Sequence, residues 1–236
     1  MSDIGPVTVS PRALRVSGFA GLVAVALVVT CVMVAPQIVA GQRVSGTVDP
    51  QLIRAYYLHP PLATLQVAVF PAAGLILLLA AGLHSLAARG RSGTLASWGL
   101  AFTIAIVPGY LLEAALQAAL VSVASSGGDV LPLFRVWDVF YNSGLYALEA
   151  GYVITFSLAL TQENVFPRWF RTFGVVAGLL QLANVSALWI GLPDAATIPG
   201  NLGMLSWLLI ASLLLLRRAN DEGRLPLRAR TGLSAS

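Results

Sequence analysis

Residues Asp129 to Thr161 read DVLPLFRVWDVFYNSGLYALEAGYVITFSLALT, a stretch longer than the roughly 20 apolar residues that a helix needs to cross a bilayer. The stretch nevertheless contains charged and polar side chains at intervals of three or four residues, which places them on one face of a helix. They are Arg135, Asp138, Asn142, Tyr146 and Glu149. Because a polar stripe is unfavourable in lipid, we expect it to face other helices or a water-filled cavity.

The composition of the whole chain indicates a membrane protein of several spans. Of its 236 residues, 57% are hydrophobic and 10% are charged, whereas soluble domains carry roughly 25% charged residues. The basic residues are all arginines, and they stand singly or in pairs at the ends of apolar segments. No basic patch with interleaved aromatic residues occurs, so nucleic acid is not an expected partner. The partner that this composition predicts is membrane lipid.

Six apolar segments predict the fold class and the domains. The class is all-α, a polytopic membrane helix bundle with six transmembrane helices at residues 17–218. A cytoplasmic N-terminal segment is expected at 1–16 and a disordered cytoplasmic tail at 219–236. The predicted spans are 19–40, 62–86, 98–123, 129–161, 172–190 and 201–216. Between the first two, Asp49-Pro50 predicts the N-cap and first residue of a short helix at the membrane interface.

The arginines predict the orientation in the membrane. Arg43 and Arg54 lie in the loops on one side, and Arg135 begins the fourth span. The other arginines lie on the opposite side, which holds both termini: Arg12, Arg15, Arg89, Arg91, Arg168, Arg171, Arg217, Arg218, Arg224, Arg228 and Arg230. The positive-inside rule therefore places both termini in the cytoplasm, for a multi-pass protein of the cell membrane.

Glu113 and Glu149 are the carboxylates that lie deepest in apolar sequence. The short turn at Ser125–Gly128 makes the third and fourth spans antiparallel neighbours, with Glu113 roughly level with Asn142 and Glu149 about two turns nearer the cytoplasm. A charge at the centre of a bilayer costs on the order of 3 kcal/mol or more. Each carboxyl is therefore expected to be protonated or to have a partner.

The candidate ligand-binding residues are those expected to line this polar interior. They are Glu113, Gln117, Arg135, Asp138, Asn142, Tyr146 and Glu149. Glu113 and Glu149 are also the candidate catalytic residues, each as a general acid. The structural alternative is that both acids only bond to neighbouring amides and hydroxyls and fix the helix register. In that alternative Arg135 and Asp138 form a local ion pair.

Three functions fit these residues. The first is a non-enzymatic membrane protein whose polar interior binds, passes or senses a small solute, an ion or a lipid. The second is an intramembrane enzyme with a glutamate general acid and a lipidic or isoprenoid substrate, although the chain lacks a recognisable diphosphate-binding cluster. The third is an accessory subunit whose polar stripe packs against a partner's helix. No metal or cofactor is expected, because His59 and His84 lie near opposite sides of the membrane. The ligand and the oligomeric state stay open.

Three short motifs carry a resemblance to known sequences. They are W-D-x-x-Y-N-S at Trp137–Ser143, the intramembrane Glu149 after it, and Pro167-Arg168-Trp169 before the fifth span. In these motifs the chain resembles a group of uncharacterised six-span bacterial membrane proteins of the type common in actinobacteria. The resemblance covers most of residues 17–218. It implies the six-span topology and no activity.

Overall fold

The computed structural model describes residues 10–30, 49–58, 69–88, 91–140, 145–190 and 197–224. Every regular element in these ranges is a helix, which confirms the all-α prediction for this part of the chain. The helices are α1 (Pro11–Leu27), α3 (Pro50–Tyr57), α5 (Val69–Ala87), α6 (Gly93–Ser125), α7 (Leu131–Val139), α8 (Tyr146–Gln162), α9 (Arg168–Trp189) and α10 (Ile198–Arg224).

Among the described residues, three helices are long and apolar enough to cross a membrane. They are α1 with the residues that follow it to Thr30, α6, and α10 as far as Glu222. A shorter apolar helix, Pro71–Ala87, lies within α5. Large apolar side chains are at least half exposed on each of the three long helices, as at Phe19, Ile104 and Leu213. Helices of this length with apolar outer surfaces favour insertion into a lipid bilayer.

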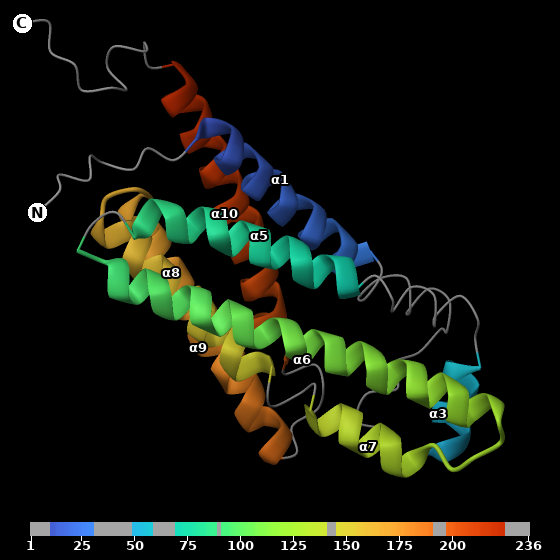
Figure 1. Cartoon of the computed structure of the whole chain (residues 1–236). Helices are drawn as coiled ribbons and strands as arrows, with labels where there is room; N and C mark the ends of the chain where they lie inside the picture. The colour runs from blue at the N-terminus through green and yellow to red at the C-terminus, as the bar shows by residue number, and fades with distance from the viewer. Residues whose placement is uncertain are drawn as a thin grey trace, which may run out of the picture.

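Six of the described helices pack as a closed ring, in the order α1, α5, α6, α8, α9, α10 and back to α1 (Figure 1). Neighbours approach closely because glycines stand at their contacts. In α1, Gly18 lies against Leu216 of α10, and Gly21, one turn later, lies against Ser212. These paired positions run in opposite directions along the two helices. The start of α1 and the end of α10 therefore lie at the same end of the ring (Figure 1).

The centre of the ring is filled by aromatic side chains around Trp207 of α10, which is fully buried. Its ring centroid lies 5.2 Å from that of Tyr152 on α8 and 5.6 Å from that of Phe170 on α9. The indole Nε1 donates a hydrogen bond of 2.7 Å to Ser157 Oγ. Gly174 of α9 leaves room for this pair, since a Cβ there would lie 1.8 Å from Ser157 Oγ.

Within the predicted fourth span, 129–161, the described ranges contain two α-helices, and residues 141–144 between them lie outside those ranges. α7 ends at Val139 and α8 begins at Tyr146. Phe140 and Leu145, the described residues between α7 and α8, both lie against Gly109 of α6. Gly109 follows Pro108, which has no N–H to donate to the helix ladder. Phe140 and Leu145 therefore both lie beside the part of α6 where the helix ladder lacks one donor, and the stripe from Arg135 to Glu149 stays a prediction.

The far end of α6 forms a second, smaller packing unit. The 33 residues of α6 span about 50 Å, more than the roughly 30 Å hydrocarbon core of a bilayer. We call α3, α7 and the last turns of α6 the distal unit (Figure 1). Its core consists of Ile53, Tyr57, Leu120, Ala124, Val130, Phe134 and Trp137. Arg54 Nη2 also donates to the Gly128 carbonyl, which ties α3 to the turn between α6 and α7.

Two helices extend beyond their predicted ends, whereas one helix start is confirmed. α1 begins at Pro11, inside the segment 1–16, and α10 continues to Arg224, inside the predicted tail. The predicted N-cap of α3 is present, because Asp49 Oδ1 accepts bonds from Gln51 N at 2.9 Å and Leu52 N at 3.4 Å. Asp49 therefore caps the helix and Pro50 begins it, as the sequence predicted.

Candidate ligand-binding site

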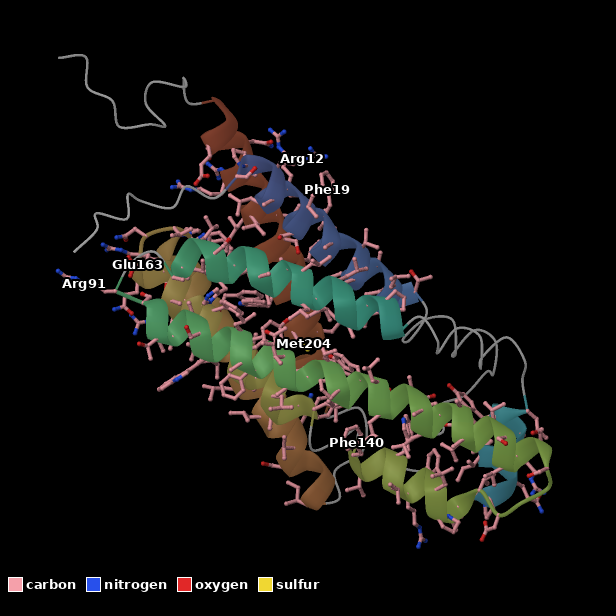
Figure 2. All side chains as sticks on the ribbon, in the orientation of Figure 1. Arg12, Phe19, Arg91, Phe140, Glu163 and Met204 are labelled. Atoms are coloured by element: carbon pink, nitrogen blue, oxygen red, sulfur yellow. The ribbon has the colours of Figure 1, made fainter. Side chains whose placement is uncertain are left out.

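Glu149 is the centre of a buried hydrogen-bond network inside the ring. Its carboxyl is 5% exposed and accepts bonds from the Tyr110 hydroxyl on Oε1 and from Gln181 Nε2 on Oε2. Gln181 Oε1 in turn accepts from Asn184 Nδ2 at 3.1 Å. Gln181 Nε2 also lies 3.6 Å from Met204 Sδ, near the middle of the molecule (Figure 2). We call Glu149, Tyr110, Gln181 and Asn184 the central cluster.

Helix geometry explains why these side chains converge. α6 and α8 are antiparallel, with Gly109 opposite Leu145, so Tyr110 and Glu149 are offset along the axis. Side chains lean toward the N-terminus of their own helix, and in an antiparallel pair the two lean toward each other. Gln181 and Asn184 share a face of α9 at a spacing of three residues.

The network also reaches α10, the fourth helix around it. Asn184 Nδ2 donates to the Thr197 carbonyl at 3.2 Å and lies 3.5 Å from Asn201 Oδ1. Gly200 makes the approach possible, since a Cβ there would lie 2.4 Å from Asn184 Nδ2. No buried polar atom of the central cluster lacks a partner among the described residues. The cluster therefore links α6, α8, α9 and α10 through satisfied polar groups.

The second carboxyl, Glu113, lies one turn from Tyr110 toward the distal unit. It is 2% exposed and accepts a bond of 3.2 Å from Gln117 Nε2. The other amide atom, Gln117 Oε1, is buried without a partner, and so is the hydroxyl of Tyr57 on α3. We call Glu113, Gln117 and Tyr57 the distal cluster.

The surroundings of Tyr57 show which groups act on its hydroxyl. Burial raises the pKa of Tyr57 well above its usual value, and the nearby Tyr56, Glu113 and Asp138 raise it further. Loss of the proton would place a negative charge in a buried site close to other acidic groups. Tyr57 therefore presents a neutral hydroxyl, which can both donate and accept a hydrogen bond.

The structure brings some of the predicted site residues together and separates others. Glu113 and Gln117 are bonded, and Glu149 lies in the central cluster. Tyr146 is buried at the first residue of α8, Asp138 is half-buried on α7 and Arg135 is exposed there. Asn142 lies outside the described residues. The ion pair between Arg135 and Asp138 stays a prediction; the salt bridge found in the described ranges joins Arg218 to Glu222.

Sequence reasoning missed the partners that come from other helices. Gln181 and Asn184 are visible as two amides three residues apart in an apolar segment, but nothing in the sequence pairs them with Glu149. Tyr110 is the only tyrosine of α6 and carries no such signal. Tyr152, one turn after Glu149, has a buried hydroxyl without a partner.

A third carboxyl, Glu163, has a structural contact at the end of the ring where α6 begins (Figure 2). Its Oε1 accepts from Ser92 N at 2.8 Å and from Ser92 Oγ at 2.9 Å. Ser92 is the N-cap residue of α6, so Glu163 satisfies one of the N–H groups that every helix start leaves unpaired. The bond also joins the loop before α6 to the loop after α8.

Comparisons with protein-family models, curated proteins and solved structures found no match to this chain. The resemblance to six-span bacterial membrane proteins therefore stays a prediction.

Proposed function

We propose that the protein is a six-span membrane protein whose polar interior binds, passes or senses a small solute, an ion or a lipid. The six helices of the ring would be the six spans, and both termini would lie in the cytoplasm. The antiparallel packing of α1 and α10 supports this arrangement, because it places the two ends together. Arg12 and Arg91 lie toward that same end (Figure 2), as the positive-inside rule requires of a cytoplasmic face.

One observation carries the functional part of the proposal. Two carboxyls, Glu113 and Glu149, are buried on either side of Tyr110, and the polar atoms around them exceed the partners that the protein supplies. Hydroxyls of Tyr57 and Tyr152 are left without a bond. Buried polar atoms without partners are rare and call for an explanation, and ionisable residues inside membrane helices mark binding sites by default.

The test is native mass spectrometry of the full chain in nanodiscs. The variants are Glu113→Gln and Glu149→Gln, which keep size and shape, and the matched control is Glu163→Gln at the helix cap. We expect a reproducible bound mass on the wild type and on the control, and its loss from at least one of the two interior variants while that variant stays folded.

One combination of results would contradict the proposal. If the wild type carries no bound mass and the interior variants lose only thermal stability, both glutamates serve structure and the proposal is wrong. Capture of a specific protein by the intact bundle would then favour an accessory subunit. Chemical conversion of the bound molecule by the wild type would favour the enzyme.

A further inference from the structure

The hydrogen bonds of the central cluster have a fixed direction on the α9 side. They begin at the backbone carbonyl of Thr197, which can only accept. The Asn184 atom that lies 3.2 Å from this oxygen is therefore the amide nitrogen. The same nitrogen donates to Gln181 Oε1 at 3.1 Å, so the nitrogen of Gln181 turns the other way, toward Glu149. One backbone carbonyl thus sets the orientation of both amides.

This direction makes the two oxygens of the Glu149 carboxyl different. Oε2 faces Gln181 Nε2, an amide nitrogen that can donate but cannot accept, so Oε2 must remain an acceptor to keep this bond. Oε1 faces the hydroxyl of Tyr110, which can do either. Oε1 is therefore the carboxyl oxygen that can carry a proton and still keep its hydrogen bond.

The helices that pack against α8 hold their cationic side chains near helix ends. α6 and α8 contain no arginine, lysine or histidine. On the other helices in contact with α8 these residues are His84 of α5, Arg168 and Arg171 of α9, and Arg217, Arg218 and Arg224 of α10. Along α9, Gln181 follows Arg171 by ten residues, which is about 15 Å.

The titratable residues nearest to Glu149 along the chain and on α6 carry no positive charge in any state. They are Tyr110, Glu113, Tyr146 and Tyr152. A proton on Glu149 therefore removes a buried negative charge that these neighbours do not neutralise.

We propose that Glu149 Oε1 is a proton-binding site and that the hydrogen bond to Tyr110 reverses when the proton binds. A hydronium ion gives its proton to the carboxylate and leaves as water. The Tyr110 oxygen, which donates its proton to the carboxylate, then accepts from the carboxylic O–H, and the Tyr110 proton becomes free to bond elsewhere. This inference rests on the proposed function, because it names an ion that the same polar interior binds.

A metal cation matches the cluster less well than a proton does. Ions such as Ca²⁺ take about six or more oxygen ligands. Gln181 turns its nitrogen toward Glu149 and bonds its oxygen to Asn184, so it presents no oxygen to the carboxylate. The described residues also hold no group of three His, Cys, Asp or Glu side chains. The donors around Glu149 therefore suit an oxygen that gains a proton.

The test is a pH titration of the full chain in nanodiscs, followed by infrared difference spectroscopy of the carboxylic C=O stretch. We expect a band that grows reversibly as the pH falls, is absent from Glu149→Gln and is retained in Glu113→Gln. These two variants assign the band to one carboxyl. The wild-type titration itself does not depend on the folding of any variant.

Two variants test the assigned contacts. Tyr110→Phe removes a hydrogen bond that is stronger with the carboxylate than with the neutral acid, so the midpoint of the Glu149 band should move to higher pH by roughly one unit, a roughly tenfold gain in proton affinity. Tyr57→Phe is the matched control, because it makes the same chemical change at a buried tyrosine of the distal unit. Gln181→Met should raise the C=O frequency, because Oε2 carries the double bond and loses its donor.

Three results would overturn the inference. The first is a wild-type spectrum in which no Glu149 band changes with pH. The second is the same midpoint in Tyr110→Phe and Tyr57→Phe, and the third is an unchanged C=O frequency in Gln181→Met. If the mass spectra show a ligand that depends on Glu113 or Glu149 while the Glu149 band does not titrate, the proposed function stands and only the proton assignment fails.

Discussion

Replacement of Glu149 tests the hydrogen bonds that hold the central cluster together. Leucine at this position would leave the Tyr110 hydroxyl and Gln181 Nε2 without their acceptor. Glutamine would keep both bonds, because its carbonyl can accept from Gln181 while its NH₂ donates to a rotated Tyr110 hydroxyl. The two substitutions are close in size, so the difference between them isolates the polar contacts.

The magnitude follows from the number of groups left unpaired. Each buried polar group left unpaired lowers the free energy of unfolding by about 1 kcal/mol. This value lies between the smaller averages measured for hydrogen bonds inside membranes and the larger ones measured in soluble cores. Glu149→Leu should therefore lose about 2 kcal/mol, a change of about 30-fold in the unfolding equilibrium, whereas Glu149→Gln should stay within about 0.5 kcal/mol of the wild type. Reversible unfolding by denaturing detergent in mixed micelles measures both. Equal stability of the two variants would refute the assigned network.

Two further predictions concern packing and capping. Gly174→Ala should lower the free energy of unfolding by about 1–3 kcal/mol through overpacking, since its Cβ would lie 1.8 Å from Ser157 Oγ and 2.9 Å from Trp207 Nε1. The control in the same unfolding assay is Gly74→Ala, whose Cβ would have nothing within 4 Å and which should be neutral or stabilising by up to about 1 kcal/mol. Glu163→Ala should cost about 0.5–2 kcal/mol and speed amide hydrogen exchange at the start of α6, because Ser92 loses its acceptor, while Glu163→Gln should retain most of the protection. Unchanged exchange at Ser92 in Glu163→Ala would show that the cap contributes nothing.

Structural features that depend on residues within one short segment could be predicted from the sequence. The cap at Asp49, the turn at 125–128 and the pairing of Glu113 with Gln117 each follow from residues within a few positions of one another. Gly127 in that turn has φ of +80°, a conformation that favours glycine. Local signals of this kind do not require knowledge of which helices become neighbours.

The remainder of the site depends on the order of helices around the ring. Gln181 contacts Glu149 because α9 packs on α8, and no periodicity within either helix contains that information.

The two clusters differ in a way that separates structure from binding. In the central cluster the buried polar atoms are paired, so a substitution that breaks those hydrogen bonds removes stability whether or not a ligand binds. In the distal cluster the Tyr57 hydroxyl is unpaired, and removal of an unpaired buried polar group should leave stability unchanged or increase it. A variant that keeps its stability and loses the bound mass has no purely structural explanation. Tyr57→Phe is for this reason more informative about function than either glutamate.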